Sequence, residues 1–159
     1  MHRLTPAAAP CGAPQDPAGL RLYAVLRGDV QMSEGKSNAQ AGHAYCDALL
    51  HSLSHPDPDI RTSAASYAAL KPGTKICLDG GSIDAMHRLM DDLAAAGIPF
   101  IQITDQDHVE LPDFDGSPIL TAIGIGPHHV KDQPRFLRRL ARWTGGKRGR
   151  LARKEAAVA

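Results

Sequence analysis

Four short apolar runs, separated by longer segments of different character, constrain the fold of this chain most. The runs are residues 22–26, 74–78, 98–104 and 119–125, and each has the length and aliphatic content of a buried strand. Helical periodicity fills the first two gaps between the runs, whereas the third gap shows no such pattern. The alternation predicts an α/β sandwich with a small mixed sheet, in which the last two strands are antiparallel.

The segments around these runs predict four helices. The first is expected over residues 37–53, where apolar side chains recur every three or four positions. An Ala-rich helix is expected over 60–70 and a short amphipathic helix over 134–143. Ser82 is the predicted N-cap of the remaining helix, which Gly97 ends. The apolar residues of that helix are predicted to be core: Ile83, Met86, Leu89, Met90 and Leu93.

Length and composition indicate one folded domain. A chain of 159 residues is too short for two full domains, and 43% hydrophobic with 22% charged residues is typical of a globular protein. No apolar run reaches the roughly 20 residues of a membrane-spanning helix. We expect a disordered leader over residues 1–20, a folded domain over 21–143 and a basic flexible tail over 144–159.

The cysteines and the leader bear on the cellular compartment. Cys11, Cys46 and Cys77 are odd in number and widely spaced, without a Cys-x-x-Cys pair. This pattern argues against a disulfide framework and against a zinc site. The leader also lacks the continuous apolar stretch of a secretory signal. We therefore expect a cytoplasmic protein with no metal.

Charge is distributed unevenly along the chain. Residues 1–130 carry 8 Lys or Arg against 15 Asp or Glu, a net charge of −7, whereas residues 131–159 carry 10 against 2, a net charge of +8. A basic segment of this kind favours contact with a polyanion such as RNA or with a membrane surface. A solvated tail that keeps the protein soluble explains the same charge.

The junction between the first strand and the first helix, Ser33-Glu-Gly-Lys-Ser-Asn38, contains the Gly-Lys-Ser of nucleotide-binding loops. A phosphate-binding P-loop needs a further glycine at position 30, which is Val30. A dinucleotide-binding loop at Gly124 and Gly126 needs a third glycine where His129 stands. The sequence therefore supports neither motif.

Four polar residues follow one another along the first helix: Lys36, Gln40, His43 and Asp47. They share an arc of roughly 60° opposite the apolar face, and such a stripe is most often a solvated helix face. Lys36, however, stands in the first turn, where the helix dipole favours a negative charge. The position therefore suits a bound phosphate, or an Asp from another element that holds the lysine in place.

Carboxylates and a histidine follow the third strand, in Thr104-Asp-Gln-Asp-His108, at the start of a long acidic loop. α/β proteins often place their chemistry outside the carboxyl ends of strands, although an acidic turn explains these residues as well. No Gly-x-Ser-x-Gly nucleophile elbow is present. A hydrolase made of these residue types would use water oriented by a carboxylate, with a lysine that stabilises negative charge. His128 and His129 are predicted to lie at the surface.

The first of these motifs and the strands that follow it resemble one family. Leu26-Arg-Gly-Asp-Val-Gln-Met-Ser-Glu-Gly-Lys-Ser-Asn-Ala-Gln-Ala-Gly-His-Ala44 looks like the opening motif of the type 2 peptidyl-tRNA hydrolases. Four further segments follow in the family's order: Thr74-Lys-Ile-Cys-Leu-Asp79, the helix from Ser82 to Gly97, Ile98-Pro-Phe-Ile-Gln-Ile-Thr-Asp105 and Thr121-Ala-Ile-Gly-Ile-Gly-Pro127. The resemblance extends over about residues 21–140, and we expect a divergent, bacterial-type member.

The resemblance implies a three-layer α/β/α fold around a four-stranded mixed sheet, a homodimer, and no metal or organic cofactor. The implied activity is hydrolysis of the ester that joins a peptide or an N-blocked amino acid to the 3′ end of tRNA. The expected catalytic residues are Lys36, Asp105, His43 and Thr121. The expected substrate-binding residues are Gln40, Arg27 and Asn38. The expected tRNA-binding residues are Arg135, Arg138, Arg139 and Arg142.

Two departures from the family pattern leave other interpretations open. The family usually has Asp-Ala-Gly-x-Thr after the third strand, but this chain has Asp105-Gln-Asp-His-Val109, so Val109 replaces the threonine thought to assist the water. His108 or Thr104 would then be the substitute. Glu34 stands where the family often has a second lysine. The chain is therefore also interpretable as a catalytically inactive tRNA- or RNA-binding relative, or as a related hydrolase of another acylated substrate.

Overall fold

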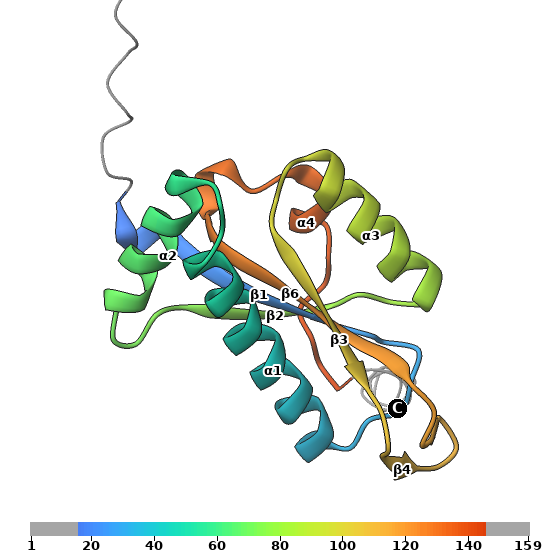
Figure 1. The fold of residues 1–159 in the computed structure, drawn as a ribbon. Coiled ribbons are helices and arrows are strands. Elements are labelled where there is room, and N and C mark those ends of the chain that lie inside the picture. Colours follow the sequence, from blue (N-terminus) through green and yellow to red (C-terminus); the bar gives the residue numbers. More distant parts are fainter. Residues whose placement is uncertain (1–15, 146–159) are drawn as a thin grey trace, which may run out of the picture.

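The computed structural model describes residues 16–145, which fold around a four-stranded mixed sheet (Figure 1). The strands are β1 (Leu20–Leu26), β2 (Lys75–Asp79), β3 (Phe100–Asp105) and β6 (Ile119–His129), in the order β2-β1-β6-β3. β1 and β2 are parallel, and β6 runs antiparallel to both β1 and β3. The predicted mixed sheet and its antiparallel last pair are confirmed.

Helices cover both faces of the sheet and give the expected three layers (Figure 1). One face carries α1 (Glu34–Leu53) and α2 (Pro58–Ala69), and the other carries α3 (Ile83–Ala95) and α4 (Arg135–Arg138). Successive residues of a strand point to opposite faces. Tyr23 and Val25 of β1 therefore join the core beneath α3, whereas Ala24 and Leu26 join the core beneath α1.

α1 approaches the sheet closely because β6 has a glycine beneath it. A Cβ at Gly124 would collide with the backbone oxygen of Ala44, and Ala48 lies beside it. Ala44 and Ala48 are fully buried on α1. Small residues on both partners thus let the helix backbone rest on the sheet, and this fixes the position of the α1 N-terminus.

The predicted cap and end of α3 are confirmed. Ser82 caps the helix, its Oγ accepting a hydrogen bond from the backbone N of Ala85 at 3.3 Å. Gly97 follows the helix with a φ of 65°, a left-handed conformation that favours glycine at a helix end. Of the five predicted core residues, Met86, Leu89 and Leu93 are buried and Met90 is half-buried against the same core, whereas Ile83 in the first turn is half-buried outside it.

The end of the domain differs from the predicted helix over residues 134–143. α4 ends at Arg138, and the segment that follows pairs with the outer edge of β2. The backbone N of Asp79 donates to the oxygen of Ala141 at 2.8 Å, and the N of Trp143 donates to the oxygen of Cys77 at 3.0 Å. The open strand edge therefore supplies the backbone hydrogen bonds that a longer helix would have made.

Two other element limits and one loop differ from the prediction. Residues 17–20, placed in the leader, form a 3-10 helix (Pro17–Gly19) and the first residue of β1. α2 starts at Pro58, because the first turn of a helix tolerates proline. The acidic loop contains a small hairpin of β4 (Val109–Glu110) and β5 (Phe114–Asp115). The remainder of the predicted leader and tail, residues 1–15 and 146–159, lies outside the described residues.

His129 was predicted at the surface and is buried, with 6% of its area exposed. β6 extends to His129, four residues further than the predicted strand. The ring packs against Gly19, where a Cβ would collide with Nε2. A 3-10 helix, Val130–Asp132, then leads to α4. No helix among residues 16–145 is long and apolar enough to cross a membrane.

Candidate active site

The carboxyl ends of β1, β2 and β3 meet at one edge of the sheet, where the predicted site residues gather. β6 runs antiparallel between β1 and β3, so its first residues lie beside the last residues of both strands: Ala122 pairs with Leu26, and Ile119 pairs with Asp105. The N-terminus of α1 reaches the same edge (Figure 1). The topology thus brings together side chains that are far apart in the sequence.

Lys36 of α1 and Asp105 of β3 form an ion pair at this edge. Lys36 Nζ lies 2.7 Å from Asp105 Oδ1, and the two side chains are only 10% and 14% exposed. The same Nζ lies 5.2 Å from the centre of the Phe114 ring, a cation–π arrangement. Because little solvent surrounds these groups, their charges interact more strongly than those of a surface pair.

Gln40 and Thr121 hold the carboxylate from behind. Gln40 Nε2 donates to Asp105 Oδ1 at 3.1 Å. Thr121 Oγ1 lies 2.6 Å from Gln40 Oε1 and 3.1 Å from the backbone oxygen of Ile103, so its single hydrogen orients the Gln40 amide. Gln40 and Thr121 are themselves buried. A hydrogen-bonded chain therefore runs from β6 through α1 to β3 and fixes the orientation of Asp105.

The second carboxylate oxygen of Asp105 has a different environment. Oδ2 is buried, and no residue in the described part of the chain hydrogen-bonds to it. A buried acceptor is normally satisfied, so one without a protein partner points to a ligand or water. With Oδ1 held by Lys36 and Gln40, Oδ2 is oriented to accept a hydrogen bond from a water molecule and to act as a general base.

The β4–β5 hairpin is tied to the loop that precedes α1. The Glu110 carboxylate accepts from the backbone N of Ser33 at 3.2 Å, and Asp113 Oδ2 accepts from the backbone N of Gln31 at 2.6 Å. Ser33 in turn caps α1 by accepting from the backbone N of Lys36. The hairpin and the helix start are therefore positioned together, and the hairpin brings Phe114 to Lys36.

Val109 stands on this hairpin where the family has threonine. Its side chain is 66% exposed, and it offers no hydrogen-bonding group. His108 is half-buried, with its ring against Phe114 and its Nε2 3.4 Å from Glu110 Oε2. Thr104 is exposed on β3. Neither proposed substitute forms a side-chain hydrogen bond or ion pair with Asp105 within residues 16–145.

Asp107 stands where the family pattern has glycine. Its φ of 61° lies in the left-handed region, which Asp adopts more readily than most residues do. Its backbone N donates to the oxygen of Gly116 at 3.1 Å. The turn that glycine would form is thus kept in this chain.

The polar stripe of α1 lies at the border of the buried face, not opposite it. Gln40 is buried and Lys36 nearly so, whereas His43 is exposed and Asp47 is half-buried. The displacement has a physical cause. Tyr45 and Leu49, which the prediction assigned to the main core, pack with α2 around Tyr67, so the sheet faces a side of α1 nearer to Gln40.

Three other predicted site residues lie near this edge without joining the network. His43 and Asn38 are exposed on α1. Arg27, the first residue after β1, pairs with Asp29 through Nε at 2.7 Å and Nη2 at 3.3 Å. Its backbone N donates to the oxygen of Thr121 at 2.8 Å, so its position relative to the network is fixed.

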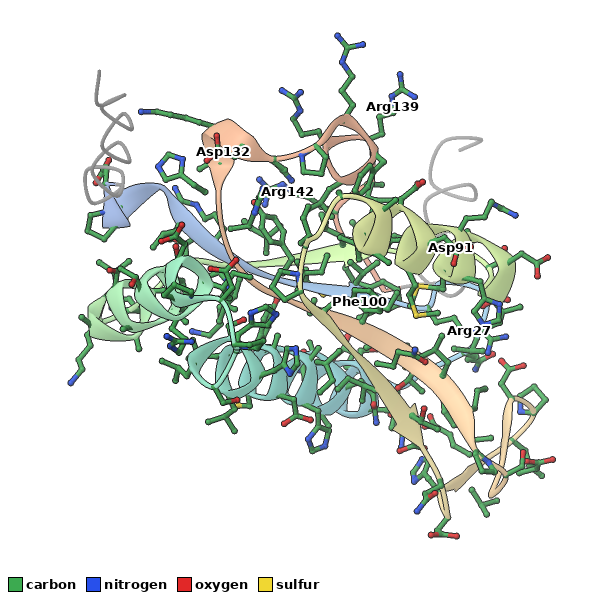
Figure 2. The ribbon with its side chains drawn as sticks, turned by 45° about the horizontal axis from the view of Figure 1, so that its top comes forward. Arg27, Asp91, Phe100, Asp132, Arg139 and Arg142 are labelled. Carbon is green, nitrogen blue, oxygen red and sulfur yellow. The ribbon has the colours of Figure 1, made fainter. Side chains whose placement is uncertain are left out.

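The four predicted tRNA-binding arginines lie on the opposite layer. Arg135, Arg138, Arg139 and Arg142 are exposed on α4 and in the segment after it. Figure 2 shows Arg139 beyond α4, across the sheet from α1. None of the four forms an ion pair with a residue between 16 and 145.

Sequence reasoning missed three residues that support the site: Phe114, Glu110 and Asp113. The acidity of the loop was the available signal, since two of its carboxylates bind the backbone before α1. The sequence does not indicate that those carboxylates fold back onto a segment some 80 residues earlier. Among residues 16–145, no group of three or more His, Cys, Asp or Glu side chains is arranged to hold a metal ion.

Comparisons with known proteins agree with this geometry. The family model "Peptidyl-tRNA hydrolase PTH2" matches residues 20–142. A peptidyl-tRNA hydrolase of Methanococcus vannielii is 34% identical over 103 residues, which cover 65% of this chain and 81% of the relative. One of Aeropyrum pernix is 27% identical over 115 residues, or 72% of this chain and 90% of the relative. A third, of Pyrobaculum aerophilum, is 27% identical with similar coverage.

These relatives are archaeal, so they give no support to the expectation of a bacterial-type member. The matched region contains the ion pair, the hydrogen-bonded chain behind it and the whole four-stranded sheet. The chain therefore belongs to the peptidyl-tRNA hydrolase PTH2 family.

Proposed function

We propose that the protein hydrolyses the ester between the 3′ end of tRNA and a peptide or N-blocked amino acid, releasing free tRNA and the peptide. The observation that carries the proposal is the Lys36–Asp105 pair at 2.7 Å, with Asp105 Oδ2 left without a hydrogen-bond partner among residues 16–145. A buried cation beside an oriented carboxylate can supply the general base and the stabilising charge for attack by water.

In the proposed reaction, Asp105 Oδ2 accepts a hydrogen bond from water and takes its proton as the water oxygen bonds to the ester carbonyl carbon. Lys36 has three N–H donors, of which one binds Asp105, so another is available for the oxyanion that forms. The bond to the ribose oxygen then breaks, and that oxygen receives the proton from Asp105. Gln40 and Thr121 position Asp105 throughout.

The remaining predicted residues are proposed to contact the substrate. His43 and Asn38 are exposed on α1 on either side of Gln40, where a tRNA 3′ end reaching Lys36 would pass. His43 is proposed to take part in catalysis by contacting the substrate near its ester. Arg27 is half-buried at the same edge and offers a guanidinium for a nearby phosphate or carbonyl oxygen.

The experiment measures amino acid released from N-acetyl-aminoacyl-tRNA and from the unblocked aminoacyl-tRNA. We expect cleavage of the blocked substrate only, and cleavage about 10³-fold slower by Lys36→Ala or Asp105→Asn. Lys71→Ala and Asp91→Asn are matched controls, because both residues are exposed and far from the site in the sequence and the fold. Equal activity in Lys36→Ala and the wild-type protein would refute the proposed function.

A second candidate function, tRNA binding without hydrolysis, is favoured by Val109. An exposed valine replaces the family threonine beside the site, so one positioning hydroxyl is missing. Removing a single group of this kind costs about 10²- to 10³-fold in rate. Binding of tRNA without release of amino acid, together with release by Val109→Thr, would establish this alternative.

The resemblance also leads us to propose a cytoplasmic homodimer. Light scattering on the purified protein tests the assembly, and a mass of one chain at micromolar concentration would refute it.

A further inference from the structure

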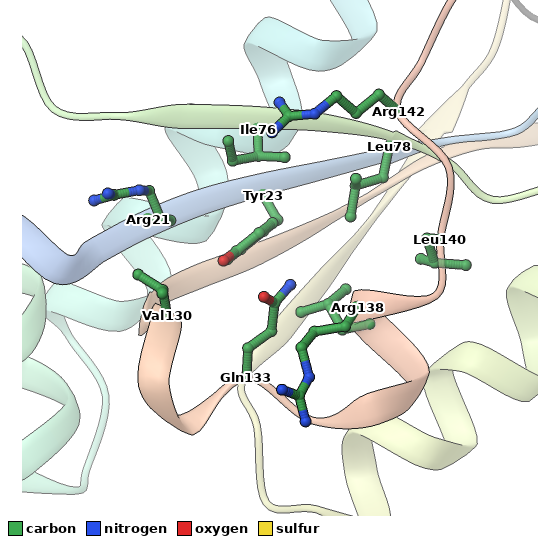
Figure 3. A pocket seen from close by; sticks show the side chains of 10 residues that line it. Arg21, Tyr23, Ile76, Leu78, Val130, Gln133, Arg138, Leu140 and Arg142 are labelled. Carbon is green, nitrogen blue, oxygen red and sulfur yellow. The ribbon is translucent and has the colours of Figure 1, made fainter.

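A cavity lies on the other face of the sheet, between the strands and the segment that follows β6 (Figure 3). Its volume is about 400 Å³, which falls within the range of small-molecule sites. Tyr23 of β1 and two residues of β2, Ile76 and Leu78, form an apolar floor. Leu137 of α4 and the nearby Leu140 close another side. The cavity lies on the layer of α3 and α4, not at the Lys36–Asp105 edge.

Three arginines from different segments stand around this floor: Arg21 of β1, Arg138 of α4 and Arg142 beside β2. None of them forms an ion pair with a described residue, and no described Asp or Glu lines the cavity. Arg21 is also held in place, since its Nη1 donates to the backbone oxygens of Ala18 at 2.6 Å and Leu20 at 2.8 Å. The cavity is therefore positively charged without a counter-charge from residues 16–145.

Two neutral polar side chains add hydrogen-bonding groups. Gln133 and Tyr23 reach toward the middle of the cavity in Figure 3. Burial raises the pKa of Tyr23, with the Arg21 charge opposing, so the phenol keeps its proton. Both side chains can donate to an anion without adding negative charge.

We propose that this cavity binds one nucleotide, with its base over the apolar floor and its phosphate bound by one of the guanidinium groups that Figure 3 shows on separate sides of the floor, Arg21, Arg138 or Arg142. Guanidinium groups bind phosphate through paired N–H donors and also stack on bases. The nucleotide belongs to a tRNA strand or is a free nucleotide, which offers the same chemistry. The tRNA case rests on the proposed function, and there the cavity is a second contact, across the sheet from the ester site.

The cavity divides the four predicted tRNA-binding arginines into two pairs. Arg138 and Arg142 line it, whereas Arg135 and Arg139 do not. All four are exposed, so Arg138→Gln/Arg142→Gln and Arg135→Gln/Arg139→Gln remove the same charge from the same region. A diffuse electrostatic surface would respond equally to both changes.

The test measures binding of deacylated tRNA to the full-length protein at fixed salt, by fluorescence anisotropy. We expect the Arg138/Arg142 change to weaken binding about 100-fold and the Arg135/Arg139 change about 10-fold, since direct phosphate hydrogen bonds add to the charge effect. Gln133→Trp, which fills the cavity without changing charge, should also weaken binding. Thermal melts identify any variant that does not fold, and Arg21→Gln then replaces it.

Adenosine 5′-monophosphate is the second probe, titrated by NMR with the methyl signals of Ile76 and Leu78 as the readout. The nucleotide site is supported if the wild-type protein binds the monophosphate and the Arg138/Arg142 variant does not. If that variant also keeps its affinity for tRNA, the ligand is a free nucleotide. Equal losses in both pairs, with no response to the monophosphate, would overturn the inference. Deacylated tRNA carries no acyl ester. These binding measurements therefore test the cavity whether or not the protein hydrolyses the proposed substrate.

Discussion

The charged side chains on the two faces of the sheet differ in whether a described residue neutralises them. On the α1 face, Lys36 and Asp105 are nearly buried and neutralise each other, and Gln40 and Thr121 hold the carboxylate in position. On the α4 face, Arg21, Arg138 and Arg142 surround a cavity without a counter-charge from the described residues. The first arrangement suits chemistry on one bond, because burial strengthens fixed charges. The second suits attraction of an anion that arrives from solvent.

The largest effect is expected when the charges on the α1 face are removed. Lys36→Ala is expected to lower kcat/KM about 10³-fold and to destabilise the fold by about 3 kcal/mol, because it leaves the Asp105 carboxylate buried without its cation. Lys36→Met/Asp105→Leu should recover most of the stability, since it removes both charges, but none of the activity. Urea denaturation and the hydrolysis assay measure the two effects separately.

If the double variant is as unstable as Lys36→Ala, the pair does not behave as two mutually compensating buried charges. Asp91→Leu on the surface of α3 controls for the loss of a carboxylate. Activity retained by the double variant would place the reaction elsewhere.

Packing also differs between the two faces, and substitution of one glycine on each face measures the difference. A Cβ at Gly124 would collide with the backbone of α1, whereas a Cβ at Gly80 would collide with two side chains, at the sulfur of Met86 and a methyl group of Val25. Side chains can shift more readily than a helix backbone, so Gly124→Ala is expected to cost about 3 kcal/mol and Gly80→Ala about 2 kcal/mol. The free energy of unfolding of each variant measures this.

Gly124→Ala should also lower activity, because it pushes away the helix that carries Lys36. A smaller stability loss for Gly124→Ala than for Gly80→Ala would contradict the rigid contact between α1 and β6. Gly35→Ala serves as a control, since no atom lies within 4 Å of the Cβ that it adds.

Thr121→Val sharpens the comparison further, because it changes only the positioning of the carboxylate. The variant keeps the shape of the side chain and removes the donor to Gln40 Oε1. We expect about a tenfold fall in kcat with a small change in KM, and a stability loss of about 1 kcal/mol. Thr121→Ser, which restores the donor, should recover most of kcat. A valine variant with wild-type kcat would show that Gln40 needs no such support.

The last prediction concerns Cys77, which packs beneath α1 and affects stability only at alkaline pH. Burial raises the pKa of its thiol from 9.0 to about 11, although a hydrogen bond with Tyr45 opposes this. Below pH 9 the thiol is neutral in both folded and unfolded chains. As pH rises from 9 toward 11 the unfolded chain ionises first, so stability should fall over this window.

Denaturation of the wild-type protein and of Cys77→Val between pH 8 and 11 measures this contribution, which the valine variant should lack. Cys46→Ser, at an exposed position, is the control. A wild-type pH dependence equal to that of Cys77→Val would contradict the assigned thiol burial.

Several elements of the fold can be predicted from the sequence. The four apolar runs predict the four main strands, and the antiparallel final pair follows from the missing helix between them. The α3 limits follow from Ser82 and Gly97, whose roles depend on local backbone chemistry. The basic end of the domain is visible in the sequence, but its division into cavity-lining and outer arginines is not.

The sequence by itself determined what local interactions decide: strand runs, helix caps, and a lysine in the first turn of a helix. Tertiary structure decided what depends on segments meeting. The edge of β2 shortened the predicted last helix by taking its backbone hydrogen bonds. Contact with α2 rotated the buried side of α1 toward Gln40, and the hairpin folded back onto the loop before Lys36. Each of these outcomes depends on partners distant in the chain, which local periodicity does not record.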